Sequence, residues 1–239
     1  MKIFVTSDTH RNLDRVLRIY DLITGDTPEG VTHVDSFDLM IHCGDLKPDA
    51  RKLGKRLGLE TVCVYGNCDH AADRAYGGHD IEKVPTPAGT ILVTHGDLEL
   101  VNSGHTNLLY LAEQEGCNCV CYGHTHLPVF DSEDGIFVVN PGSPSRPLDG
   151  TAYGSCAILN AEENGYSGEI LYYEDLFGDE DCEGYADGGS GRSGGADGGS
   201  GRSGGADKSS GSKDGSAKKN GKSGVGGFLR KIFNYSDGQ

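Results

Sequence analysis

Residues 2–10, KIFVTSDTH, join a short apolar run to two polar side chains. The run over 2–7 is rich in β-branched and aromatic residues, which predicts a β-strand. Asp8 and His10 follow directly after it. A carboxylate and an imidazole at a strand end are potential metal ligands, but a turn carrying a surface histidine gives the same short pattern. The pattern gains weight only if it recurs elsewhere in the chain.

It recurs four times. Strands are predicted at 37–42, 61–65, 90–94 and 118–122, and each runs into a polar residue or into a glycine followed by one. The polar residues at all five strand ends are Asp8, His10, Asp45, Asn67, His95, His124 and His126. Sites in open α/β sheets form at the carboxyl ends of strands, so we expect these side chains to converge.

Apolar residues at helical spacing predict helices over 13–23, 48–57 and 106–115, the first capped by Asn12. After residue 127 only strands are predicted, at 127–131, 136–139, 153–159 and 169–173. The expected architecture is therefore two sheets packed face to face with helices outside. Cys117, Cys119 and Cys121 alternate along one apparent strand, so we expect them to face one side as small buried hydrophobes.

The folded domain is predicted to cover 1–175. Half of the 38 glycines lie in the remaining 64 residues, where residues 187–196 repeat identically as 197–206. We therefore expect a disordered linker over 176–226. The last segment, 227–239, sets four apolar residues on one face of a short helix. Three roles stay open for it: packing on its own domain, docking to a partner protein, or weak contact with an anionic membrane surface.

Residues 1–175 carry a net charge of −15, which argues against general nucleic-acid binding by the folded domain and also suits a salty cytosol. No apolar run approaches the ~20 residues of a membrane span, and the first residues lack the apolar core of a signal peptide. We therefore expect a cytoplasmic protein whose eight cysteines stay free of disulfides.

The strand-end set comprises two carboxylates, one amide and four imidazoles, with no thiolate required. Such nitrogen and oxygen ligands suit Mn²⁺, Fe²⁺, Zn²⁺ or Ni²⁺ better than Ca²⁺, which prefers oxygen alone. Seven groups exceed what one catalytic ion needs, but they suffice for two ions if one carboxylate bridges them.

The motifs D-x-H, G-D, G-N-C-D, T-H-G and G-H-T-H, in this order, resemble those of the calcineurin-like metallophosphoesterase superfamily. The segment Asn140-Pro141-Gly142-Ser143 is similar to that of its small bacterial and archaeal phosphodiesterase branch. The resemblance covers about residues 1–175. It implies an α/β fold, a four-layer sandwich of two mixed β-sheets flanked by helices, with a dinuclear metal site at one edge.

By position, the resemblance assigns Asp8, His10, Asp45 and His126 to a first metal ion. It assigns Asn67, His95 and His124 to a second ion, with Asp45 bridging the two. The implied cofactors are two divalent ions, with Mn²⁺ favoured over Ni²⁺, Fe²⁺ or Zn²⁺. The implied reaction is hydrolysis of a small phosphodiester by a hydroxide held between the ions. The residues expected at the reacting centre are Asp45, Asn67 and Cys68.

Two positions depart from the wider superfamily. Cys68 stands where many members carry a histidine that acts as general acid, and a thiol is the poorer proton donor at neutral pH. We therefore expect a preference for diesters with good leaving groups. Asp97 stands where relatives often carry a second histidine. His42 is interpreted as a core or supporting histidine, and Arg146 either contacts a substrate phosphate or is a surface residue.

Two other functions stay open. The first is a catalytically weak protein-binding scaffold, because the retromer scaffold subunit has a similar fold. The second is a phosphomonoesterase, which would differ only in the substrate pocket.

Overall fold

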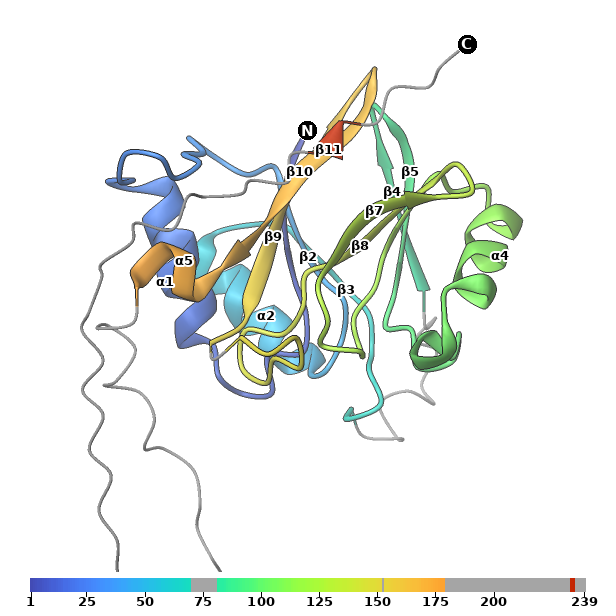
Figure 1. The fold of residues 1–239 in the computed structure, drawn as a ribbon, viewed down its shortest axis with the longest axis horizontal. Coiled ribbons are helices and arrows are strands. Elements are labelled where there is room, and N and C mark those ends of the chain that lie inside the picture. The colour runs from blue at the N-terminus through green and yellow to red at the C-terminus, as the bar shows by residue number, and fades with distance from the viewer. Residues whose placement is uncertain (70–80, 152, 179–232, 235–239) are drawn as a thin grey trace, which may run out of the picture. The chain divides into compact units, whose positions relative to one another are not determined.

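The fold is described by a computed structural model for residues 1–69, 81–151, 153–178 and 233–234 (Figure 1). All of its elements belong to one unit, Met1–Gly184 with Arg230–Gln239. Strands and helices alternate in the first part of this unit, and strands dominate after residue 127. The unit contains two β-sheets, each with parallel and antiparallel neighbours.

The first sheet has the strand order β11-β10-β9-β1-β2-β3. Strands β1, β2 and β3 are parallel, whereas β9 runs antiparallel to β1, and β10 antiparallel to β9. The bounds of these strands are β1 Lys2–Thr6, β2 Leu39–His42, β3 Thr61–Cys63, β9 Ser155–Glu162, β10 Gly165–Tyr172 and β11 Phe233–Asn234.

The second sheet has the strand order β4-β5-β6-β8-β7. Its central strands β5, β6 and β8 are parallel, and the edge strands β4 and β7 are antiparallel to their neighbours. The bounds are β4 Ile81–Thr86, β5 Gly89–Thr94, β6 Cys119–Cys121, β7 Val129–Glu133 and β8 Ile136–Asn140.

Helices cover the outer face of each sheet (Figure 1). The helices α1, α2 and α5 pack on the first sheet, and α4 packs on the second. The bounds are α1 Asp14–Thr24, α2 Lys47–Leu57, α4 Thr106–Gln114 and α5 Tyr173–Phe177, with a short 3-10 helix η1 at Val101–Ser103.

Successive residues of a strand enter different cores, because side chains alternate across a sheet. Ile3 and Val5 of β1 belong to the core between the sheets, and Phe4 belongs to the core under α1. In β5, Val93 faces the space between the sheets and Leu92 faces α4. Strands buried on both faces give four layers, helix, sheet, sheet, helix, which confirms the predicted fold class.

Four local features differ from the expectations. Only strands were expected after residue 127, but residues 173–177 form the helix α5. Helix α1 begins at Asp14 with Leu13 at its cap and no side-chain cap hydrogen bond, so Asn12 does not cap it. Cys119 and Cys121 share the inner core, but Cys117 precedes β6 and belongs to the core under α4. Strand β4 was not predicted, since Pro85 and two charged residues obscure its pattern. Its place at a sheet edge accommodates the proline.

Most of the tail lies outside the described residues, namely 179–226 of the predicted linker and most of the segment 227–239. Leu176 and Phe177, the first two residues of that linker, belong to α5 and pack against the core under the helices. Within the segment 227–239, β11 pairs antiparallel with Ser167 and Gly168 of β10. The membrane and partner-docking roles considered for 227–239 therefore concern residues that are not described. Among the described helices, none has the length and apolar character needed to cross a membrane.

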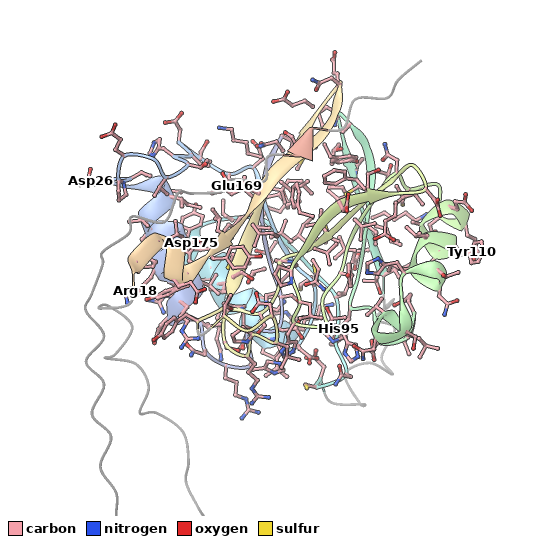
Figure 2. The ribbon with its side chains drawn as sticks, viewed as in Figure 1. Arg18, Asp26, His95, Tyr110, Glu169 and Asp175 are labelled. Carbon is pink, nitrogen blue, oxygen red and sulfur yellow. The ribbon has the colours of Figure 1, made fainter. Side chains whose placement is uncertain are left out.

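Replacing Phe4 with alanine should lower the free energy of unfolding by about 3–5 kcal/mol, because it empties a fully buried site. The Phe4 ring lies 5.5 Å from each of the rings of Tyr20 and Phe37, measured between centroids. Tyr110→Ala is the control, since Tyr110 projects from α4 and is 66% exposed (Figure 2). Urea unfolding monitored by circular dichroism measures both. Similar losses in the two variants would contradict the assignment of Phe4 to the core.

Candidate metal centre at the carboxyl ends of the strands

The polar residues predicted at strand ends come together where the two sheets meet. They follow β1, β2 and β3 of the first sheet and β5 and β6 of the second, so the carboxyl ends of parallel neighbours supply them. His95, labelled in Figure 2, lies at this edge. The backbone nitrogen of His124 donates to Oδ2 of Asp8 at 3.1 Å, which ties the second sheet to the first.

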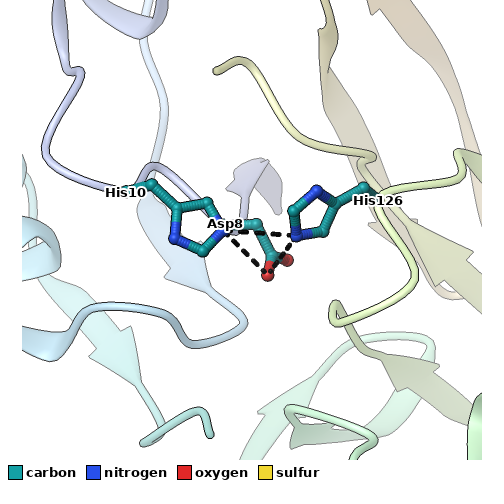
Figure 3. A group of neighbouring side chains, drawn as sticks. All are labelled: Asp8, His10 and His126. Atoms are coloured by element: carbon teal, nitrogen blue, oxygen red, sulfur yellow. Dashed lines mark hydrogen bonds and ion pairs between the residues drawn. The ribbon is translucent and has the colours of Figure 1, made fainter. Parts of the chain in front are cut away.

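One group consists of Asp8, His10 and His126 (Figure 3). Oδ1 of Asp8 lies 3.2 Å from Nε2 of His126 and 4.0 Å from Nε2 of His10. The two Nε2 atoms are themselves 3.3 Å apart. Asp8 is fully buried, and all three side chains direct a potential ligand atom to one point.

Oδ1 of Asp8 is a buried acceptor without a hydrogen-bond donor among the described residues. Its partner oxygen Oδ2 accepts from the Ser7 hydroxyl at 2.5 Å and from the His124 backbone nitrogen. Nδ1 of His126 lies 2.5 Å from the carbonyl oxygen of Arg146, which can only accept, so the proton sits on Nδ1. The neutral ring then directs the lone pair of Nε2 at the Asp8 carboxylate. Two lone pairs facing each other require a cation or a further proton between them.

A second group involves Asn67, His95 and His124. Nδ1 of His95 donates to the carbonyl oxygen of Cys43 at 2.7 Å, which leaves its Nε2 without a proton. That Nε2 lies 3.0 Å from Oδ1 of Asn67, and Nδ1 of His124 lies 2.9 Å from the same oxygen. Again, ligand atoms converge from different loops.

Asp45 lies between the two groups. Its carboxylate is 3.6 Å from Nε2 of His95. It also shares one cluster of ligand atoms with His10 and Cys68, and another with Asp8 and His95. A carboxylate within reach of both sides is what a bridging ligand requires.

The charge states of the imidazoles follow from their surroundings. Burial lowers the pKa of His10 and of His124, which favours the neutral, ligating form at pH 7. Burial also lowers the pKa of His126, but contact with Asp8 raises it more, so its net shift is upward. A proton on His126 is therefore the species that a metal ion would displace.

The backbone at the site is unusual. Five of the seven residues have positive φ, namely Asp8 (52°), His10 (44°), Asp45 (45°), His124 (66°) and His126 (56°). This left-handed region is uncommon for residues other than glycine, and each case costs on the order of 1–3 kcal/mol unless the surroundings hold it. The loops are thus held in conformations that the chain would not adopt by itself.

Residues outside the predicted set hold these loops. The Ser143 and Ser145 hydroxyls both donate to the backbone carbonyl of Asp8, at 2.8 and 3.1 Å. Asp49 accepts from the Arg11 backbone nitrogen at 2.7 Å. Asp69 accepts from the Gly66 backbone nitrogen at 2.8 Å and so closes the loop that carries Asn67. No spacing signal marked Asp49, whereas Asp69 ends the G-N-C-D motif and Ser143 belongs to the motif expected to shape a loop beside the site.

His42 is fully buried. Its Nδ1 accepts from the Gly44 backbone nitrogen at 3.3 Å, and its Nε2 lies 3.2 Å from the Thr9 hydroxyl. Burial lowers its pKa to about 4, so it is neutral at pH 7. It therefore supports the strand end that carries Asp45 from within the core.

Replacing Gly66 with alanine should weaken metal binding about 10–100-fold, the usual effect of disturbing groups that orient a ligand. A Cβ at this position would come within 2.6 Å of the Asp45 backbone nitrogen and overlap the Asp45 carboxylate. Gly58→Ala is the control, since Gly58 has φ of +68° but open space around it. Calorimetric titration of both variants with Mn²⁺ makes the measurement, and equal affinities would contradict this geometry.

Comparison with known proteins finds relatives that are named phosphoesterases. The probable metallophosphoesterase YsnB of Bacillus subtilis is 36% identical over 118 residues, which are 48% of this chain and 64% of YsnB. The phosphodiesterase MJ0936 of Methanocaldococcus jannaschii is 29% identical over 176 residues, 72% of this chain and 99% of that protein.

The zinc complex of Vps29 from Entamoeba histolytica superimposes with a TM-score of 0.55 at 17% identity, over 71% of this chain and 91% of that one. At this identity the likeness concerns the fold alone. Residues 1–164 match the model of the calcineurin-like phosphoesterase superfamily domain. Motifs, fold and family model agree, and the chain belongs to the calcineurin-like phosphoesterase superfamily.

Proposed function

We propose that this chain is a metal-dependent phosphodiesterase that hydrolyses small phosphodiesters with two divalent metal ions. The observation that carries the proposal is the donor-free Oδ1 of Asp8, buried opposite the Nε2 atoms of His10 and His126, which lie 4.0 and 3.2 Å from it. A proton on His126 or a cation satisfies this arrangement, and a cation also satisfies the Nε2 of His10. The relative named a phosphodiesterase supplies the substrate class.

In this proposal Asp8, His10, Asp45 and His126 hold the first ion. The second ion is held by Asn67, His95 and His124, with Asp45 shared between the two. The nitrogen and oxygen ligands favour Mn²⁺, with Fe²⁺, Zn²⁺ and Ni²⁺ as the alternatives. When bound, two such ions supply an activated water as nucleophile and neutralise charge on the phosphoryl oxygens.

The chain's own residues contribute orientation and protons. The carbonyl oxygens of Cys43 and Arg146 fix the rings of His95 and His126. Arg146 is exposed, and its positive charge contributes to lowering the pKa of His10, after burial. A cation near the ligands suits an anionic diester, so we assign Arg146 to the substrate phosphate.

We assign Cys68 to the leaving group. Its backbone nitrogen donates to Oδ1 of Asp45 at 2.8 Å. Burial, and then the Asp45 carboxylate, raise the pKa of the thiol to about 11. It thus stays protonated at neutral pH but is a weak acid, which favours esters whose leaving group needs no proton.

A protein-binding scaffold is the second candidate function, supported by the shared fold with Vps29. All seven ligand residues are present in this chain, which favours the enzyme. A phosphomonoesterase would use the same centre. One assay separates the three: metal binding without turnover of any ester supports the scaffold, and turnover of monoesters over diesters supports the phosphomonoesterase.

Asp45→Asn should lower hydrolysis of bis(4-nitrophenyl) phosphate on the order of a hundredfold or more, because it removes the shared negative ligand of both ions. Metal bound per chain, measured by elemental analysis, should fall with it. Asp35→Asn is the matched control, since the Asp35 side chain is 93% exposed. Full activity in Asp45→Asn would refute the bridging role.

Cys68→His should shift the preference toward poor leaving groups. We expect the rate on a diester with an alkoxide leaving group, relative to the 4-nitrophenyl diester, to rise about tenfold or more, because imidazolium is a stronger acid than a thiol. Cys68→Ser, which cannot supply such an acid, controls for the loss of sulfur. Rate ratios from parallel steady-state assays decide the matter, and an unchanged ratio in Cys68→His would exclude a proton-donor position at residue 68.

A further inference from the structure

An imidazole that binds a metal through one nitrogen carries its proton on the other, and that N–H needs an acceptor. For His95 and His126 the acceptors are backbone carbonyls, those of Cys43 and Arg146. Both rings therefore hold the proton on Nδ1 and direct Nε2 into the centre.

His124 is turned the other way. Its Nδ1 faces the centre, 2.9 Å from Oδ1 of Asn67. Its Nε2 points outward and lies 2.9 Å from the amide nitrogen Nδ2 of Asn102. The outer nitrogen of His124 is thus held by a side chain, whereas the other two rings are held by the main chain. Asn102 belongs to none of the motifs found in the sequence.

The position of Asn102 is fixed by the loop that follows His95. Asn102 lies in η1, whose first residue, Val101, is buried and donates its backbone N–H to the Gly96 carbonyl at 3.2 Å. Ser103 donates back to the carbonyl of Leu100 at 2.8 Å. A Cβ on Gly96 would come within 2.9 Å of Val101, so the loop packs closely on the strand end. The loop that follows His95 thereby places Asn102 beside His124.

An asparagine suits this place because its amide offers a donor and an acceptor at the same end. The two are exchanged by a 180° rotation of the amide, and the ring protons follow the hydrogen-bond network. With the amide NH₂ toward Nε2, the ring carries its proton on Nδ1, toward Asn67. With the amide oxygen toward Nε2, the proton moves to Nε2 and Nδ1 is free to bind a cation.

We propose that Asn102 is a positioning residue that sets the tautomer of His124, its amide oxygen accepting from Nε2–H when Nδ1 binds the second ion. This inference rests on the proposed dinuclear centre. It identifies a residue outside the seven proposed ligands that controls how tightly His124 binds the second ion. It also predicts that an obligate acceptor at position 102 serves the metal-bound form at least as well as asparagine.

The test compares Asn102→Leu and Asn102→Asp, two variants of nearly the same size as asparagine. Asn102→Leu removes the acceptor and should weaken binding of the second Mn²⁺ about 10–100-fold in calorimetric titration. Asn102→Asp retains an acceptor and should bind it as tightly as the unchanged protein or more tightly. If Asn102 served only in packing, both variants would change the affinity for the second Mn²⁺ in the same direction. Asn118→Leu is the control, since Asn118 bonds to Ala88 and Tyr166, away from the centre.

A second measurement reads the tautomer directly. With Zn²⁺ bound, long-range ¹H–¹⁵N spectra of the His124 ring should show the proton on Nε2 in the unchanged protein and in Asn102→Asp. If Asn102→Leu binds two ions with the same affinity and shows the same His124 tautomer as the unchanged protein, the role of Asn102 is overturned and the proposed function still stands. An unchanged protein that binds no ions would overturn both.

Discussion

The strand ends hold the potential ligand atoms of three side chains close together. Oδ1 of Asp8, Nε2 of His10 and Nε2 of His126 meet within 4.0 Å. Their repulsion would separate the loops in water, where each atom could find a donor. Here the packed strands fix the loops, so the repulsion between these atoms lowers the stability of the fold. A bound cation or proton removes this repulsion. The left-handed backbone at five of the seven residues is a further cost of the same kind.

The negative charge of the domain favours the binding of metal cations but disfavours the binding of an anionic substrate. A net charge of −15 draws divalent cations from solution, but it repels an anionic ester. Bound cations would reverse the local sign, and Arg146 adds a positive charge beside them. Substrate binding and metal binding are then coupled, because an anion approaches this edge readily only when the cations are present.

Much of the fold could be predicted from sequence because the same local pattern, an apolar strand followed by a polar residue, occurs five times. Continuous apolar runs in segments such as 2–6 and 90–94 mark strands buried on both faces, and a candidate ligand follows each of these strands. Features set by distant contacts leave no such repeat. The cap of α1, the strand β4 that contains Pro85, and the different core entered by Cys117 depend on neighbours that spacing does not reveal. The same holds at the site. The seven candidate ligands and the motif that contains Asp69 could be read from the sequence, but Asp49 and Asn102 act through hydrogen bonds across loops, which spacing does not reveal.

The first strand of the chain occupies the middle of its sheet, with β2 on one side and β9 on the other. The carbonyl of Asp8, at the end of that strand, is held by Ser143 and Ser145. During synthesis, Ser143 and Ser145 emerge from the ribosome well after β1. The loop that follows β1 therefore gains these hydrogen bonds only late in synthesis. In the proposed centre, metal loading would therefore follow synthesis of the chain at least through Ser145.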